Sequence, residues 1–379
     1  MKHKIIIIGG GASGLMLASL LPKSSLLLIE HNPKLGEKIR ISGGGRCNVT
    51  NEKMHSDYFL GEHTFIQPVL KRFSSASLLR WLSFFGCEPV LRKGSQYFCK
   101  ERATELLDIF QKEVKRHHIA LNESVESVTK EGELFEVKTS KRTLKAEHVV
   151  VASGGLSFPL LGASDIGYRI AEHFGHTIVK QDPALVGFTV QKEQFFFKEL
   201  SGLSCDVRLE VGQKQFEGAM LFTHKGVSGP AILNASLYWK KGAMSIDFLP
   251  NISLNTLLQG RKNITTLLPL PKRLTKAFLV QFGLDDKVAS QLSKEERKRL
   301  EMLHHYRFSP AGTFGYRKAE VTKGGVLTQE IDSKTMMSQK VKGLYFLGEV
   351  VDVTGQLGGY NFQWAFSSAY TCAQHLKRI

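Results

Sequence analysis

The feature that most constrains this chain is a glycine turn directly after its first apolar run. Ile5–Ile8 is a continuous β-branched stretch, which is typical of a parallel strand buried on both faces. Gly9, Gly11 and Gly14 follow at G-x-G-x-x-G spacing. In this pattern the first glycine forms a tight turn, the second lets a pyrophosphate approach the backbone, and the third lets a helix pack on the strand. The spacing therefore predicts a helix over residues 12–21 with a dinucleotide at its N-terminus.

An acidic residue at the end of the next apolar run supports this interpretation. Leu26–Ile29 ends in Glu30, whose carboxylate is placed to accept hydrogen bonds from ribose hydroxyls. Ala12 and Ser13 open the predicted helix, where free N–H groups and the helix dipole favour an anion. Glycine turns also occur wherever a helix packs tightly on a sheet, but the order strand, helix, acid favours the dinucleotide site. The motif alone does not separate FAD from NAD.

Residues 31–51 follow with almost no secondary-structure periodicity, and we expect a loop that contacts a flat, anionic cofactor. The candidate contacts are glycines that allow close approach, cations, and side chains that form hydrogen bonds: Lys38, Arg40, Ser42, Gly43, Gly44, Gly45, Arg46, Asn48, Thr50 and Asn51. A surface Ω-loop is the alternative. Cys47, in the same loop, is a candidate cofactor contact and reactive thiol, although a lone cysteine is more often a small packed residue.

Composition limits the class of protein. With 379 residues, 42% of them apolar, the chain can form two or three domains. No apolar run is long enough to span a bilayer and no signal peptide is evident, so we expect a cytoplasmic protein without membrane insertion. The five cysteines include no C-x-x-C pair, which indicates buried thiols. The net charge of +16 suits nucleic acid, but the cations are scattered, which favours a solvated basic surface and no stable nucleic-acid complex.

A second strand that ends in glycine indicates the kind of dinucleotide. Short strands at 123–128, 134–139 and 143–146 predict a β-meander, and His148–Ala152 predicts another buried strand. It ends in Ser153, Gly154 and Gly155, a second close approach of backbone to cofactor. Two strands that end in glycine favour FAD.

The order of elements predicts an α/β fold, with a doubly wound, Rossmann-like FAD-binding domain split in sequence. We expect this domain to comprise residues 1–186 and 316–379, with a boundary at Asp182-Pro183. A β-rich insertion is expected over 187–252 plus about 306–315. The apolar spacing changes to a helical period over 253–305, which predicts a small helical subdomain.

The segment GEKIRISGGGRCNVTN resembles the hallmark of the BaiN/YhiN-type FAD-binding flavoproteins, whose members include enzymes described as aminoacetone oxidases and bile-acid reductases. Similar segments recur over nearly the whole chain, including DPALVGFTV, LFTHKGVSGPAILNAS and GLYFLGEVVDVTGQLGGYNFQWAFSSAY. The resemblance implies non-covalent FAD in a glutathione-reductase-type domain. It also implies that Val125 contributes backbone contacts beside the adenine; otherwise Val125 is one more core residue.

The C-terminal segment supplies the remaining cofactor candidates, which are Gly348, Glu349, Gly358, Gly359, Tyr360 and Asn361. In FAD enzymes an acid after such a strand hydrogen-bonds the ribityl chain, and a helix N-terminus faces the flavin. Glu349 and Asp352 are the candidate acids, and Asp352 is equally well explained as a turn residue.

We therefore expect an FAD-dependent oxidoreductase that transfers a hydride between flavin and a small organic substrate. NAD(P)H, bound transiently, and O2 are candidates for the other partner. The alternatives are a nucleic-acid-associated flavoprotein and a flavin-binding protein without turnover. No nucleophile triad and no metal-ligand spacing is evident, and no catalytic residue stands out. Tyr360, Glu320 and His224 are candidate acid–base groups, each with a structural explanation as well.

Overall fold

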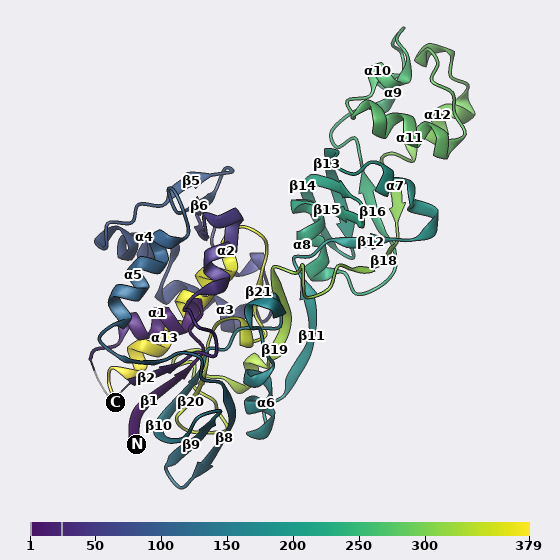
Figure 1. Ribbon diagram of the computed structural model, residues 1–379. Helices are drawn as coiled ribbons and strands as arrows, with labels where there is room; N and C mark the ends of the chain where they lie inside the picture. Colours follow the sequence, from purple (N-terminus) through teal and green to yellow (C-terminus); the bar gives the residue numbers. More distant parts are fainter. Residues whose placement is uncertain (1, 24–25) are drawn as a thin grey trace. The chain divides into compact units, whose positions relative to one another are not determined.

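The computed structural model describes residues 2–23 and 26–379, which form two compact units (Figure 1). The first unit comprises residues 1–183 and 320–379, and the second comprises residues 184–319. The division after Pro183 falls within a strand, β11 (Ile178–Ala184), beside the boundary that the sequence predicted at Asp182-Pro183. The residue before a proline prefers an extended backbone, which a strand provides. β11 pairs with β19 (Val321–Val326), at the point where the chain re-enters the first unit.

A seven-stranded sheet forms the centre of the first unit. Its path runs in the order β7 (His118–Ala120), β2 (Leu26–Ile29), β1 (Lys2–Ile8), β10 (Thr143–Val151), β9 (Leu134–Thr139) and β8 (Val125–Glu131), and β20 (Leu344–Phe346) also pairs with β10. β1 pairs in parallel with both β2 and β10. Ile5–Ile8 are all buried, as the continuous apolar run predicted.

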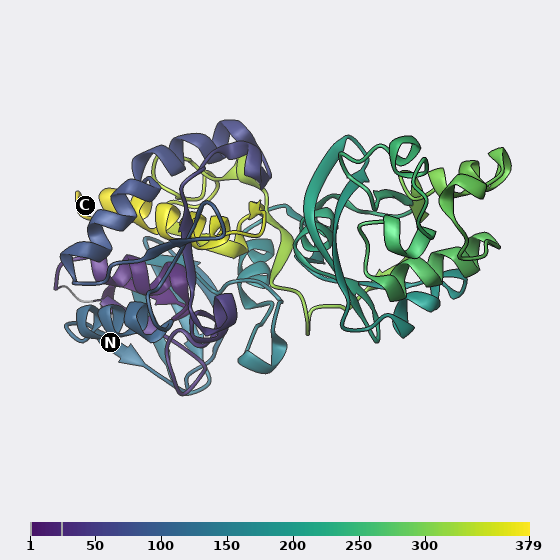
Figure 2. The same cartoon turned by 90° about the horizontal axis from the view of Figure 1, so that it is seen from above.

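Helices from opposite ends of the chain cover this sheet. α1 (Ala12–Leu20) packs against α13 (Tyr360–Leu376), and Figure 2 shows the purple and yellow helices side by side. α5 (Thr104–Val114) also contacts α1, and α6 (Ile166–His173) contacts β8. The two chain ends therefore share one hydrophobic core.

The strand β10 is longer than the sequence indicated. Two strands were expected, over 143–146 and 148–152, but one strand runs through Glu147. Its first half pairs antiparallel with β9 and its last residues pair in parallel with β20. Because β1 pairs with both halves, the strand continues without a turn. The Glu147 carboxylate also forms an ion pair with Lys2 at 2.9 Å.

The expectation of an irregular loop over residues 31–51 is wrong for its second half. α2 (Glu37–Gly45) and β3 (Asn48–Asn51) form there, and Ser42–Gly44 depart from helical dihedral angles within α2. Ile39 is the buried residue of α2, so no apolar periodicity reveals the helix in the sequence. The glycines matter at its end, because Gly43, Gly44 and Gly45 have φ values of 57°, 66° and 83°.

A cap of helices and a small sheet surrounds this segment. The helices are α3 (His63–Arg72), α4 (Ser75–Phe84) and α5. β3 pairs with β6 (Gln96–Phe98), which pairs with β5 (Val90–Arg92). A separate two-stranded pair joins β4 (Phe59–Leu60) to β21 (Thr354–Gly355).

The second unit has its own sheet and hydrophobic core. In spatial order its strands are β17 (Tyr306–Phe308), β16 (Met244–Asp247), β13 (Ser204–Val211), β14 (Lys214–Thr223), β15 (Gly226–Ser228), β12 (Phe188–Val190) and β18 (Pro310–Thr313). Its helices are α7 (Phe196–Glu199), α8 (Pro230–Tyr238), α9 (Leu254–Leu257), α10 (Ile264–Leu267), α11 (Lys272–Phe282) and α12 (Lys294–Glu301). The strands come first and the helices of 254–301 follow, and the chain then returns to the sheet.

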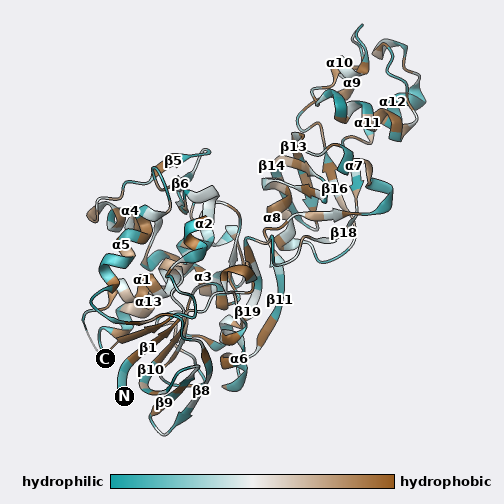
Figure 3. Cartoon of the chain, in the orientation of Figure 1, coloured by the Kyte–Doolittle hydropathy of each residue, from teal (hydrophilic) through white to brown (hydrophobic). Residues whose placement is uncertain are grey.

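The hydropathy of the elements matches their burial. Figure 3 shows β1 and β10 in brown at the centre of the first unit, and polar residues over much of α5 and α12. Among the described residues, no helix combines the length and the apolar character needed to cross a membrane.

Candidate cofactor-binding site

The glycine turn between β1 and α1 has the close packing that its spacing predicted. Gly9 has a φ of +105°, and a Cβ at this position would lie 2.5 Å from the carbonyl oxygen of Ala152, which directly follows β10. A Cβ on Gly14 would lie 2.0 Å from the carbonyl oxygen of Gly9, so only glycine lets α1 approach this closely. A Cβ on Gly11 would meet none of the described atoms within 4 Å. Gly11 therefore borders open space, at the position predicted for the pyrophosphate.

The N-terminus of α1 faces this space without a capping side chain. Gly11 is the N-cap residue, and no side chain among the described residues caps the helix. The first N–H groups of a helix have no acceptor within the helix, so those of Ala12 and Ser13 remain for another partner. The helix dipole favours an anion as that partner.

Glu30 is buried at the end of β2, with an exposure of 6%. Its Oε2 accepts a hydrogen bond from the Gly10 N–H at 2.7 Å, and its Oε1 accepts one from the Asn32 N–H at 2.8 Å. His31 Nδ1 lies 3.3 Å from Oε1. A carboxylate oxygen accepts about two hydrogen bonds, so Oε2 retains room for a ribose hydroxyl. The sequence did not show that Glu30 also fixes the glycine turn.

Strand β8 starts near the same end of the sheet. The N–H of Glu123 donates to the carbonyl oxygen of Glu30 at 3.1 Å, and the N–H of Asn122 donates to that of Asn32 at 3.2 Å. Val125, two residues later, is 9% exposed. The backbone around Val125 is therefore near the predicted ribose site, and its contact with adenine stays a prediction.

The residues after β10 combine open space with an unpaired hydroxyl. Ser153 Oγ is buried and has no hydrogen-bond partner among the described residues. Gly154 has a φ of +77°, and a Cβ there would meet none of the described atoms within 4 Å. In contrast, Gly155 is closely packed, because its Cβ would lie 2.7 Å from both Glu349 Oε1 and Thr322 Oγ1. A buried hydroxyl without a partner is uncommon in folded proteins, and Ser153 Oγ lies beside α6, where a Cβ on Gly167 would be 2.2 Å from it.

An ion pair that the sequence did not predict joins the two chain ends. Lys38 Nζ lies 2.7 Å from Glu349 Oε2, and the Thr322 N–H donates to Glu349 Oε1 at 2.9 Å. Thr322 Oγ1 also accepts hydrogen bonds from the N–H groups of Leu156 and Ser157, at 2.8 and 3.1 Å. Glu349, which we predicted to contact the ribityl chain, is thus held by two partners. No local sequence signal relates positions 311 residues apart.

The C-terminal glycines pack against the N-terminal elements. Gly348 has a φ of +69°, and a Cβ there would lie 2.7 Å from Ser13 Oγ. A Cβ on Gly359 would lie 2.6 Å from the carbonyl oxygen of Thr50, and Asn51 Nδ2 donates to the carbonyl oxygen of Gly358 at 2.9 Å. These contacts require glycine and bring α13 onto β3.

Two further cofactor candidates in this segment already have structural partners. The Tyr360 ring stacks on Tyr58 with a centroid distance of 4.9 Å, and burial raises its pKa above the ordinary value. Asn361 exchanges two hydrogen bonds with the backbone of Gly355, each of 2.8 Å. Neither side chain is therefore free to reorient, and any cofactor contact would use their remaining atoms.

The loop after α2 presents a mixture of open and closed positions. Cβ atoms on Gly44 and Gly45 would meet none of the described atoms within 4 Å, whereas one on Gly43 would lie 2.9 Å from the Asn48 nitrogen. The Arg46 side chain is exposed, and Arg40 Nε lies 3.6 Å from Glu37 Oε1. Cys47 is fully buried with a φ of +45°. Cys47 is therefore a packed thiol, and no contact with the glycine turn is found for Arg40 or Arg46 among the described residues.

The candidate acid–base groups differ in position. His224 is exposed in the turn between β14 and β15 of the second unit, and Glu320 is exposed before β19. Asp352, which the sequence offered as an acid for the ribityl chain, is half-buried, and its carboxylate has no hydrogen bond or ion pair to the described residues. Burial raises the pKa of Asp352 to about 6. An acid with a pKa near neutrality can hold and release a proton at physiological pH.

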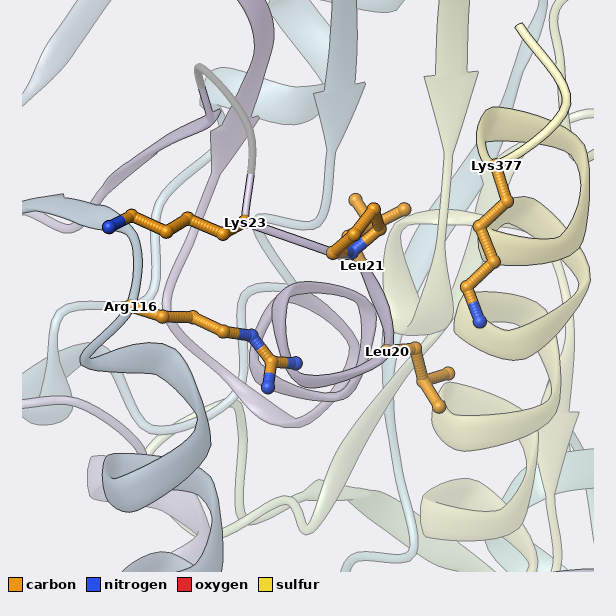
Figure 4. Close-up of a pocket in the computed structure, with 6 residues that line it drawn as sticks. Leu20, Leu21, Lys23, Arg116 and Lys377 are labelled. Carbon is orange, nitrogen blue, oxygen red and sulfur yellow. The ribbon is translucent and has the colours of Figure 1, made fainter.

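A separate pocket lies at the opposite end of α1. It has a volume of about 330 Å³ and is lined by Leu20, Leu21, Pro22, Lys23, Arg116 and Lys377 (Figure 4). α1 has nine residues and is therefore about 13 Å long, so this pocket is distant from the glycine turn. The Arg116 guanidinium is already paired with Glu113 at 2.7 Å. We do not assign the cofactor to this pocket.

Three pairs of contacts bring predicted cofactor residues from different segments together in one region of the first unit. Gly10 contacts Glu30, Gly9 contacts Ser153, and Ser13 contacts Gly348. A Cβ on Gly11, Gly44, Gly45 or Gly154 would meet none of the described atoms within 4 Å, so the backbone at each of these positions is open to close approach. These features fit a bound dinucleotide. The fold and site define a flavoprotein oxidoreductase with a Rossmann-type FAD-binding domain.

Comparisons with known proteins agree with this class. Residues 3–375 match the family described as HI0933-like protein Rossmann domain, and the chain belongs to this family. The chain is 39% identical to the ribosomal RNA dihydrouridine synthase of Haemophilus influenzae, over 98% of each chain. It is 40% identical to the enzyme of the same name from Escherichia coli, over 99% of this chain and 98% of that one.

A third relative and a solved structure are more distant. The chain is 30% identical to the 3-dehydro-bile acid delta(4,6)-reductase of Clostridium scindens, over 97% of each chain. This relative agrees with the resemblance to BaiN-type flavoproteins that the sequence motifs indicated. The fold is similar to that of the quinol fumarate reductase subunit FrdA of E. coli, with a TM-score of 0.54 and 13% identity, over all of this chain and 70% of that chain.

Proposed function

We propose that this protein is an FAD-dependent reductase that converts uridine to dihydrouridine in ribosomal RNA. The observation that carries the proposal is the identity of 39–40% to two ribosomal RNA dihydrouridine synthases, over almost the full length of each. The proposal departs from our expectation that the basic surface is merely solvated and that no stable nucleic-acid complex forms. It keeps the expected flavin chemistry and changes the substrate class.

The distribution of charge supports an RNA substrate. Residues 184–319 contain 20 lysines and arginines against 11 aspartates and glutamates, while the remaining 243 residues contain 31 against 24. More than half of the net charge of +16 is therefore in the second unit. Lys272 and Lys276 on α11 and Lys298 on α12 are exposed and have no ion pair among the described residues. Such cations can neutralise backbone phosphates.

The reaction requires a hydride donor, a proton donor and a site that positions the uracil base. Dihydrouridine differs from uridine by two hydrogens added across the C5=C6 bond, so one carbon receives a hydride and the other a proton. Reduced FAD, when bound, supplies the hydride. In this proposal the N-terminus of α1 and the glycines around it hold the pyrophosphate, and Glu30 holds the ribose. The Asp352 carboxyl is our candidate proton donor, since a pKa of about 6 keeps part of it protonated at neutral pH.

The test combines a reaction with purified components and an analysis of cells. Ribosomal RNA transcribed in vitro, which lacks modified bases, is incubated anaerobically with the FAD-loaded protein and NADH or NADPH, and nucleosides are measured by mass spectrometry. We expect uridine to gain two hydrogens at a defined site, and we expect ribosomal RNA from cells lacking the gene to lose dihydrouridine at that site. The RNA proposal is wrong if the purified protein converts neither the transcript nor ribosomal RNA isolated from the deletion cells, and if the dihydrouridine content of the deletion cells is unchanged.

A small conjugated ketone is the second candidate substrate. The relative from C. scindens is named as a bile-acid delta(4,6)-reductase, and saturation of a carbon–carbon double bond is the same type of reaction. Reoxidation of the anaerobically reduced protein by steroid or cyclic enones, at rates that uridine-containing RNA does not match, would favour this candidate. NADH and NADPH are the candidate reductants for either substrate.

A further inference from the structure

Three buried cysteines lie close together in the cap of the first unit. Cys47 follows α2, Cys87 follows α4 and Cys99 directly follows β6, and each is at most 5% exposed. The sulfur atoms of Cys87 and Cys99 lie within 4.8 Å of one another, and the Cys99 N–H donates to the carbonyl oxygen of Cys47 at 3.2 Å. The fold therefore assembles a thiol cluster from three segments that the sequence separates widely.

Glu105, in the first turn of α5, adds a carboxylate to this cluster. The sulfur atoms of Cys87 and Cys99 and a carboxylate oxygen of Glu105 all lie within 4.8 Å of one another. Ligands at about 2.3 Å from a tetrahedral ion are roughly 3.8 Å apart, so modest side-chain rotations give a coordination geometry. The three atoms are therefore close enough to one another to share one ion.

The backbone holds the Glu105 carboxylate in place. Oε1 accepts hydrogen bonds from the N–H groups of Glu101 and Arg102, at 2.7 and 2.8 Å, and Oε2 accepts one from Lys100 at 3.2 Å. A carboxylate has about four acceptor positions, so Oε2 retains one. Glu105 can therefore bind an ion without losing its hydrogen bonds.

We infer that Cys87, Cys99 and Glu105 form a zinc site, with a water molecule as the fourth ligand. Two thiolates select Zn²⁺ over Mg²⁺ and Ca²⁺, which prefer oxygen ligands. The Cys47 thiol lies outside the ligand set. The sequence predicted no metal site, because eleven residues separate Cys87 from Cys99 and the pattern matches no familiar zinc motif.

The zinc site has a structural consequence for the cofactor region. It ties the end of α4, the end of β6 and the start of α5 to one ion. The Cys99 N–H donates to the carbonyl oxygens of Arg46 and Cys47 at 3.0 and 3.2 Å, and the Ala103 N–H donates to that of Gly45 at 2.7 Å. Zinc would therefore stabilise the glycine-rich loop of residues 43–48.

The experiment measures zinc in the full-length protein, independent of turnover. Protein purified with reductant and loaded with Zn²⁺ is desalted and analysed by elemental mass spectrometry and native mass spectrometry, and its affinity is measured by competition with a chelator. We expect one zinc per chain in the unmodified protein and in Cys205→Ser, whose cysteine belongs to the second unit. Cys87→Ser and Cys99→Ser should each weaken zinc binding by about tenfold or more.

Several results would overturn the zinc site. The first concerns the unmodified protein: if it retains less than a tenth of an equivalent of zinc after reduction and zinc loading, the site does not exist. This result would refute the site regardless of the results for the variants. Unchanged zinc affinity in both serine variants, with native circular dichroism, also refutes it. Peptide mapping that shows a Cys87–Cys99 disulfide in protein isolated from cells, together with no retained zinc, would assign the cluster to thiol redox chemistry instead.

Discussion

Two alanine substitutions in the same glycine turn should affect different properties, because the two glycines differ in their surroundings. One should lower the thermal stability, and the other should lower the affinity for FAD. In Gly14→Ala, the new Cβ would lie 2.0 Å from the carbonyl oxygen of Gly9 and 3.4 Å from Ile7 Cγ2. Backbone atoms cannot move aside as a flexible side chain can, so α1 must shift. Overpacking of this kind costs about 1–3 kcal/mol. For a unit of this size each kcal/mol lowers Tm by about 2–4 °C, so we expect a decrease of roughly 2–12 °C.

In Gly11→Ala, the new methyl group meets none of the described atoms within 4 Å, and the φ of −83° is accessible to alanine. We expect the Tm of the flavin-free protein to change by no more than about 2 °C. The methyl group would occupy space predicted for the pyrophosphate. A loss of about 1–3 kcal/mol of binding free energy corresponds to a decrease in FAD affinity of roughly 5- to 150-fold.

The assay is thermal unfolding by circular dichroism without flavin, followed by titration of FAD with flavin fluorescence. Gly312→Ala in β18 is the control, because its nearest contact would be 3.6 Å, and both measurements should be unchanged. If Gly11→Ala binds FAD with the affinity of the unmodified protein, the open space at Gly11 is not the pyrophosphate site. If Gly14→Ala leaves the Tm unchanged, the contact between α1 and the turn does not constrain the fold.

Three further predictions concern pH and charge. Burial alone would raise the pKa of Glu330, but hydrogen bonds from Lys340 and Thr177 outweigh burial and lower the pKa to about 2. The pKa of a glutamate in the unfolded chain is about 4.3, so the ionised carboxylate stabilises the fold by about 3 kcal/mol above pH 5. This stabilisation is lost as the pH falls toward 2. Glu330→Gln should therefore remove this acid-dependent part of the free energy of unfolding, measured by urea denaturation between pH 3 and 7. If Asp352 donates the proton, kcat should fall as pH rises through about 6, and Asp352→Asn should give a low, pH-independent rate; a variant that keeps the pH profile would exclude it. Charge reversal of Lys272, Lys276 and Lys298 should weaken RNA binding. It should also reduce the slope of log affinity against log salt concentration by up to about one unit per lysine. Lys112→Glu on α5 should have little effect.

The sequence predicted those parts of the fold that depend on local patterns. The run Ile5–Ile8, the glycine spacing and Glu30 are confirmed as strand, turn and buried acid, because each depends on neighbouring residues. The helix within residues 37–45 was missed, since one buried residue gives no periodicity. The division of β10 into two strands was wrong because pairing with β1 is a long-range property that no local turn signal reports.

The candidate site was predicted less completely than the fold, for a related reason. Glycines that a Cβ would crowd, such as Gly14, Gly348 and Gly359, stand out in the sequence as motif positions. The pair Lys38–Glu349 and the hydrogen bonds of Thr322 do not, because they depend on the meeting of the two chain ends. The thiol cluster was missed in the same way. Spacing rules find sites built from one segment, whereas Cys87 and Cys99 come from a turn after a helix and the end of a hairpin strand.

The distribution of charge separates two tasks that one chain performs in our proposal. The first unit contains the glycine turn, Glu30, Glu349 and Asp352, and so carries the groups proposed to hold FAD and supply a proton. The second unit has a net charge of +9 on 136 residues, against +7 on the other 243, and so has more than twice the charge per residue. In this proposal the first unit holds the pyrophosphate of FAD, whereas RNA carries a phosphate at every nucleotide. The net charge of the second unit therefore supports RNA as the substrate, beside the identity to the two ribosomal RNA enzymes that carries the proposal.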